Sequence, residues 1–266
     1  MKSSLRMGVV CLTLLVGIGA AQAQDVTVTI ENLAPANGTF QTPFWIGFHD
    51  GSFDLFDAGS AASSGLESLA EDGSTASVSS AFGAAVPGGL DATLTAPGGT
   101  PDAPVFSPGE SASMSYTIPT PSANRYFSFA SMVIPSNDAF IGNDSPTSIE
   151  LFDGAGNFKG PVTLTILGSM VYDAGTEVND ELPANTAFFG QAGPNTGINE
   201  SGLVGLHGGF LAAGNGGILD DAMFANADFT AGGYEVARIT ITPEPGTMAL
   251  LGLGSMALLR RRRQRV

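Results

Sequence analysis

The sequence is poor in the residue types that form many catalytic and metal sites. Its one cysteine, Cys11, lies in an apolar stretch near the N-terminus, so the rest of the chain can form no internal disulfide. Its two histidines, His49 and His207, lie in no His-x-x-x-His spacing, which argues against a zinc site. No Gly-x-Ser-x-Gly elbow occurs, and the single tryptophan, Trp45, offers little stacking surface for a sugar-binding cleft. We therefore expect no catalytic residues.

Basic residues are also scarce. The chain has 10 lysines and arginines against 25 aspartates and glutamates, a net charge of −15. Between residues 25 and 242 only Arg125, Lys159 and Arg238 remain, against 24 acidic residues, which gives this segment a net charge of −21. Such a surface repels the phosphates of nucleic acid, so no nucleic-acid partner is expected. Either the charge attracts divalent cations, or it only keeps the protein soluble.

Both ends of the chain have the features of export signals. Residues 1–23 combine two early basic residues, an apolar stretch over residues 7–20 and the small-x-small tripeptide Ala21-Gln22-Ala23. This order is typical of a secretory signal peptide cleaved before Gln24.

The C-terminal segment, residues 243–266, has three parts. Pro243-Glu244-Pro245 ends the preceding domain, because proline interrupts both helices and central strands. An uncharged apolar run then covers residues 247–259, and its 13 residues fall short of the roughly 17–25 that a stable membrane helix needs. The arginines that follow keep the C-terminus in the cytoplasm; they are Arg260, Arg261, Arg262, Arg263 and Arg265.

This order of parts resembles the PEP-CTERM sorting signal of exopolysaccharide-producing Gram-negative bacteria. The resemblance implies an exosortase-type processing enzyme as partner, a transient stay of an apolar C-terminal helix in the inner membrane, and delivery to the cell envelope, the cell surface or the extracellular matrix. A hydrophobic terminal helix of a soluble domain is the alternative.

Residues 25–242 read as one all-β domain. Short runs that alternate apolar and polar residues are separated by turns rich in glycine and proline, which favours an antiparallel β-sandwich. One short helix is expected over residues 63–71, where Leu66, Leu69 and Ala70 share a face with Glu67 and Glu71 beside it. Residues 195–217 are expected to form long loops. The predicted strands are 26–30, 113–118, 126–134, 148–152, 162–167 and 236–241.

Four segments resemble the spondin domain family. They occur in the family's order and span nearly the whole domain: the Ala-Ser, Gly-Leu-Glu and Leu-Ala-Glu-x-Gly phrases within Phe48–Gly73; the Met-x-x-Pro-Ser-x-Asp-x-Phe-x-Gly phrase within Phe129–Gly142; the Asp-Ala-Gly-Thr-acid motif of Tyr172–Glu177; and the closing strand Val236–Ile241. The sequence departs from animal spondins in three ways. Ala139 replaces a tryptophan, the cysteines are absent, and Glu177 replaces the more usual aspartate.

The resemblance implies a sandwich related to calcium-dependent lipid-binding domains, with Ca²⁺ held by loops at one end. By match to the family, Asp138, Asp173 and Glu177 are the expected ligands. Ca²⁺ prefers six to eight oxygen ligands on adaptable loops, which suits these residue types. A plain turn at Asp173-Ala-Gly-Thr is the alternative. Further acids and amides lie nearby without support from the family, namely Asn137, Asn143, Asp144 and Asp180.

Two functions follow as expectations. The first is an exported, non-enzymatic matrix or adhesion protein that binds calcium and associates with exopolysaccharide or biofilm, through an unidentified polysaccharide or matrix protein. The second is a secreted hydrolase of matrix polymers, which would need a deep cleft with perturbed carboxylates.

Overall fold

The computed structural model describes residues 23–98 and 104–244. Two antiparallel sheets face one another. The first contains four strands, in the order β5 (Ser111–Ile118), β1 (Gln24–Asn32), β11 (Glu235–Pro243) and β8 (Val162–Leu167). The second runs in the order β10 (Gly205–Leu206), β9 (Tyr172–Asp173), β7 (Ala139–Gly142), β6 (Tyr126–Ile134), β3 (Phe44–His49) and β4 (Leu90–Leu94), with β2 (Phe40–Gln41) also paired to β6. The expected antiparallel sandwich is confirmed.

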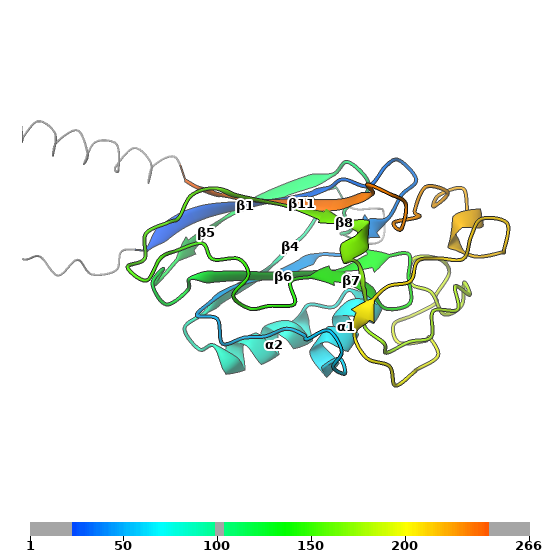
Figure 1. The fold of residues 1–266 in the computed structure, drawn as a ribbon, viewed down its shortest axis with the longest axis horizontal. Helices are drawn as coiled ribbons and strands as arrows, with labels where there is room; N and C mark the ends of the chain where they lie inside the picture. Colours follow the sequence, from blue (N-terminus) through cyan, green and yellow to red (C-terminus); the bar gives the residue numbers. More distant parts are fainter. Residues whose placement is uncertain (1–22, 99–103, 245–266) are drawn as a thin grey trace, which may run out of the picture.

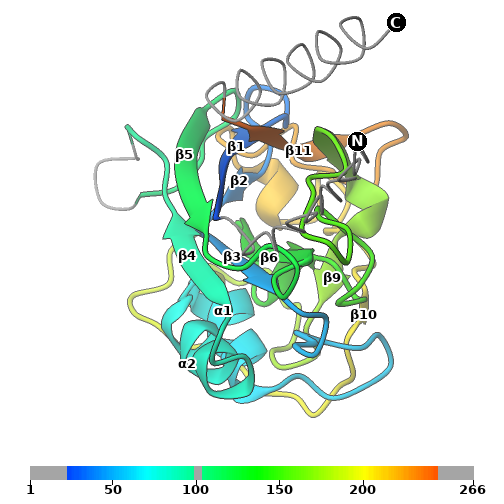
Figure 2. The ribbon, with the colours of Figure 1, turned by 90° about the vertical axis from the view of Figure 1, so that its left-hand side faces the viewer.

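Two helices add a third layer. Figure 1 shows α1 (Ser64–Asp72) and α2 (Ala76–Ala85) side by side on the outer face of the second sheet, and Figure 2 shows them beneath β3 and β4. Strand β3 is therefore buried on both faces. Phe44, Ile46 and Phe48 point into the core between the sheets, whereas Trp45 packs against the helices.

Helix α1 forms where the sequence predicts it. The Ser63 side chain accepts a hydrogen bond from the Leu66 backbone N–H at 3.2 Å and so caps the first turn. Gly73 ends the helix in the left-handed conformation, with φ of 65°. Leu66, Leu69 and Ala70 are buried as expected, but Glu71 is buried with them.

Three details of the expected fold are wrong. Helix α2 was not predicted, because its serine-rich sequence buries only Val78 and Phe82. Residues 148–152 form isolated bridges with Tyr126 and Phe158 and no strand. Strands β3, β4 and β7 were missed, and β3 and β7 are buried at every residue, so neither shows the alternation expected of a half-buried strand.

Most of the segment 174–233 is loop, stabilised by short turns and the 3₁₀ helix at Ile218–Asp220. These loops gather at the end of the sandwich that also holds β7 and α1 (Figure 1). Within the described ranges no helix has the length and apolar character needed to cross a bilayer. The predicted signal peptide of residues 1–23, apart from residue 23, and the apolar run 247–259 lie outside the described residues.

The glycines Gly168 and Gly83 give a test of the packing. A methyl group at Gly168 would lie 1.8 Å from the backbone oxygen of Phe229, whereas one at Gly83, within α2, meets nothing within 4 Å. Gly168→Ala should therefore lower the free energy of unfolding by about 2 kcal/mol or more. Gly83→Ala should raise it by roughly 0.5–1 kcal/mol, because alanine favours the helix. Urea titrations of both variants measure this, and equal effects would contradict the described packing at Gly168.

Candidate metal centre

Pairing of β7 with β9 brings the first two predicted ligands together. Asp138 directly precedes β7 and Asp173 ends β9, and the register pairs Ala139 with Asp173. The backbone N–H of Ala174 also donates to the backbone oxygen of Asp138 at 3.2 Å. Two segments 35 residues apart in sequence are thus fixed beside one another by the backbone of the second sheet.

Asp138 organises the turn that contains the third predicted ligand. Its Oδ2 accepts hydrogen bonds from the backbone N–H groups of Thr176 and Glu177 at 2.8 and 3.1 Å, and from the Thr176 hydroxyl at 3.2 Å. Its Oδ1 has no hydrogen-bond partner, although the residue is 0% exposed. One oxygen of Asp138 therefore holds the turn, while the other is available to a ligand.

The two carboxylate oxygens of Glu177 also differ in their hydrogen bonding. Its Oε1 accepts a hydrogen bond from the backbone N–H of Gly197 at 3.0 Å, and its Oε2 is buried without a partner. A methyl group at Gly197 would lie 2.2 Å from the carboxylate, so a larger residue at position 197 would displace the Glu177 side chain.

Asp173 differs from these two acids, because both its oxygens are used. Oδ1 accepts from the Gly175 N–H at 2.6 Å, and Oδ2 accepts from the Asn179 side-chain amide at 2.5 Å. Asn179 Oδ1 in turn lies 3.2 Å from Nε2 of His207. Because His207 Nδ1 accepts the Gly209 N–H, Nε2 bears the proton and donates it to Asn179. Asp173 is therefore held in place by a chain of polar side chains.

Glu71 is the acid that the sequence reading missed as a site residue. It projects from α1, is 1% exposed, and its Oε1 has no partner. The Gly-Leu-Glu…Leu-Ala-Glu phrase contained it, but the helical pattern placed it beside the apolar face rather than within it. Of the additional candidates, Asn137, Asn143 and Asp180 each make hydrogen bonds to neighbouring backbone or side-chain groups, and Asp144 is exposed.

These acids repel one another. Burial raises the pKa of Asp138 to about 6, and the Asp173 charge adds to this. Burial also raises the pKa of Glu177 to about 7, assisted by the charges of Glu71 and Asp138. Burial likewise raises the pKa of Glu71 to about 7. The hydrogen bond from the Thr176 hydroxyl lowers this pKa, and the charges of Glu67, Asp72 and Asp138 raise it further. At neutral pH the cluster favours either bound protons or a bound cation.

The orphaned oxygens of Asp138 and Glu177 suit a hard cation such as Ca²⁺, which takes carboxylate oxygens as ligands. In the described ranges, however, no group of three or more histidine, cysteine, aspartate or glutamate side chains is arranged to hold a metal ion as it stands. The structure thus places the three predicted residues near one another, and calcium coordination stays a prediction.

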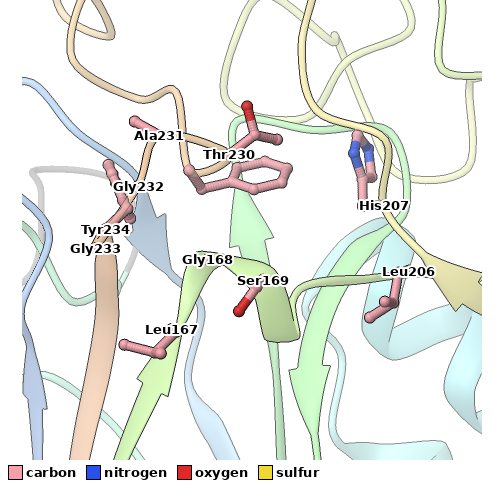
Figure 3. Close-up of a pocket in the computed structure, with 11 residues that line it drawn as sticks. Leu167, Gly168, Ser169, Leu206, His207, Thr230, Ala231, Gly232, Gly233 and Tyr234 are labelled. Carbon is pink, nitrogen blue, oxygen red and sulfur yellow. The ribbon is translucent and has the colours of Figure 1, made fainter.

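A separate cavity lies beside this region. It measures about 280 Å³ and is lined by Leu167–Ser169, Leu206, His207 and Phe229–Tyr234. Figure 3 shows His207 and Leu206 on one side and residues 230–234 on the other. No carboxylate lines this cavity, so the cluster of acids does not face it.

The sorting motif begins on the domain itself. Pro243 is the last residue of β11, and the Glu244 carboxylate accepts hydrogen bonds from the hydroxyls of Thr27 and Ser115. Strand β11 therefore includes Pro243, and Glu244 still contacts the domain. Proline is tolerated there because the strand ends. Pro245 and the arginines Arg260–Arg263 lie outside the described residues.

Comparison with known proteins agrees with this architecture. Residues 38–183 match the family model described as Spondin_N, and residues 242–263 match the PEP-CTERM protein-sorting motif. The first match covers more than half of the chain, and the protein belongs to the spondin N-terminal domain family. The match ends before β11, so the Val236–Ile241 segment gains no support from it. No curated protein matches the chain.

The sorting motif indicates how the protein is processed and where it is exported. It indicates processing by an exosortase-type enzyme and export through the inner membrane to the cell envelope or surface.

The perturbed acids predict a pH dependence that a neutral variant should remove. Because the pKa of Glu177 is about 7 in the folded protein and 4.5 ordinarily, the folded state retains a proton that the unfolded state loses between these values. Its contribution to stability therefore falls as the pH rises through that window. In chelator, the stability advantage of Glu177→Gln over the wild type should grow by roughly 2 kcal/mol between pH 5 and pH 8. Chemical denaturation at each pH measures this, and a constant difference would contradict the shift.

Proposed function

We propose that this protein is a calcium-binding, non-enzymatic adhesion or matrix component at the cell surface, and that its ligand is an acidic extracellular polysaccharide. The observation that supports the proposal best is the pair of buried, unpartnered carboxylate oxygens on Asp138 and Glu177, two residues joined by a hydrogen bond from the Glu177 backbone N–H to the other oxygen of Asp138. Asp173 would complete the family's expected ligand set. When bound, calcium would supply positive charge that neutralises the acids.

Charge explains why a cation matters to the function. The domain's net charge of −21 repels an anionic polysaccharide at long range. A divalent ion at the loop end of the sandwich lowers this repulsion locally, because it offsets the charge of the acids there. Association with biofilm or exopolysaccharide is then a calcium-dependent contact made by the loops.

A secreted hydrolase is supported by one feature, the raised pKa values of the acids, because enzymes use such shifts for acid catalysis. A glycosidase also requires two carboxylates that reach a bound sugar. Asp138, Glu177 and Glu71 are 0–1% exposed, and the cavity of Figure 3 contains no carboxylate. We therefore favour the binding protein.

Calcium should stabilise the folded protein through Asp138. At a free ion concentration one hundred times the dissociation constant, the gain is about 2.7 kcal/mol, which corresponds to a rise in melting temperature of roughly 5–10 °C for a domain of this size. Asp138→Asn should abolish most of this rise and melt higher than the wild type in chelator, because it removes a buried charge while an amide oxygen can still cap the turn. Scanning calorimetry with calcium or chelator measures both effects.

Asp153→Asn is the matched control, since it removes one charge from a hairpin turn whose hydrogen bonds are local. It should respond to calcium as the wild type does. Magnesium at equal ionic strength tests simple screening of the surface charge. Equal stabilisation by magnesium and calcium, or an intact calcium response in Asp138→Asn, would contradict the proposed site.

Retention on an anionic polysaccharide tests the adhesion function. The secreted protein should be retained on resin-coupled dextran sulfate in calcium, and chelator should release it, because the ion offsets the repulsion between two acidic surfaces. Asp138→Asn should be retained weakly in both conditions. Equal retention on neutral dextran, or retention unaffected by chelator, would count against a calcium-dependent contact with acidic polysaccharide.

A further inference from the structure

Glu71 lies where a charged side chain is least expected. It sits on the face of α1 that packs on the second sheet, among Leu66, Leu69 and Ala70. It is 1% exposed, and its Oε1 has no hydrogen-bond partner. A buried carboxylate with one unpartnered oxygen is costly unless it binds a proton or a cation.

The charges that act on Glu71 are all negative, namely those of Glu67, Asp72 and Asp138. The charge of Glu71 acts on Glu177, and the charge of Asp138 acts on Glu71, so the three carboxylates form one electrostatic cluster. All three have one oxygen that is buried and unpartnered. They come from three separate places in the fold, namely helix α1, the residue before β7, and the turn after β9. We define Glu71, Asp138 and Glu177 as the three-acid cluster.

The described part of the chain has no basic side chain free to neutralise this cluster. It contains three lysines and arginines. Arg125 and Lys159 both pair with Glu150, and Arg238 pairs with Glu31 at 3.0 Å. Nearby His207 is buried, and burial lowers its pKa, which keeps it neutral. The positive charge must therefore come from solution.

We propose that Glu71 is a ligand of the same cation as Asp138 and Glu177, and that the bound ion fastens the helical layer to the loop end of the sandwich. This inference rests on the proposed calcium binding and extends it to a residue outside the family's expected ligand set. The three acids do not form a ready ligand group as they stand. Ion binding must therefore draw the Glu71 side chain and the turn together, which couples the order of α1 to calcium.

The coupling is measurable on the secreted protein with Glu71→Gln, a neutral side chain of the same shape. Glu67→Gln is the matched control, because Glu67 lies one turn earlier on α1, has the same charge and is partly exposed. Calorimetric titration with calcium at fixed ionic strength gives the dissociation constant, and hydrogen exchange of the α1 amides with and without calcium reports the order of the helix.

We expect Glu71→Gln to weaken calcium binding by about tenfold or more, because the number of carboxylate ligands sets calcium affinity over several orders of magnitude. Calcium should slow exchange in α1 of the wild type and of Glu67→Gln, and should leave α1 of Glu71→Gln unchanged. In chelator, Glu71→Gln should melt above the wild type, since a buried repulsive charge is gone. Glu71→Asp keeps the charge on a shorter arm and should bind with intermediate affinity.

Three results would overturn the inference. Wild-type calcium affinity in Glu71→Gln, with calcium still protecting α1, removes Glu71 from the site and leaves the calcium proposal intact. Failure of Glu71→Gln to fold in chelator contradicts the claim that the unneutralised charge of Glu71 destabilises the domain. In that case Glu71→Asp still tests ligation, because calcium affinity equal to that of the wild type argues against a bond between the ion and the Glu71 carboxylate. A wild-type protein that binds no calcium at all refutes both proposals.

Discussion

Repulsion among buried carboxylates is the constraint on which the loop end of this protein depends. Asp138, Glu177 and Glu71 each bury an oxygen that no donor satisfies, and the three basic side chains of the described residues are committed to Glu150 and Glu31. The fold retains this arrangement because Asp138 also caps the 173–177 turn through three hydrogen bonds. The same residue thus stabilises the turn and concentrates negative charge, which makes the loops responsive to a cation or to protons.

The sandwich supplies the rigidity that such a site needs. Its two sheets and the helical layer enclose two apolar cores, and β3 contributes to both of them. Pairing of β7 with β9 then fixes Asp138 and Asp173 through backbone hydrogen bonds, so their spacing does not depend on long side chains. Sites built on strands hold their geometry better than sites on free loops.

Much of this fold could be predicted from the sequence, and the reason is visible in individual elements. Strands β1, β5, β8 and β11 each bury one face, so the alternation of apolar and polar residues predicted them. Helix α1 was indicated by the capping residue Ser63, the terminal Gly73 and an apolar face. Strand β3 could not be read in this way, because a helical layer covers its second face and every residue is buried. Helix α2 has only Val78 and Phe82 as buried anchors.

The candidate site was predictable only in part. Asp138, Asp173 and Glu177 were predicted from sequence motifs. The pairing of β7 with β9 explains why these motifs lie close together in the fold. Glu71 was overlooked as a site residue because a glutamate at the border of a helical apolar face ordinarily reaches solvent. Its burial depends on how closely α1 approaches the turn at Thr176, which is a property of tertiary packing and not of the local sequence.

A crystal structure of the secreted protein grown in calcium tests the central claim most directly. The account predicts one calcium ion, identified by its anomalous scattering, bound at about 2.3–2.6 Å from Oδ1 of Asp138 and Oε2 of Glu177. Density that shows these two carboxyl groups hydrogen-bonded to each other or to water at saturating calcium, with no ion between them, would contradict it.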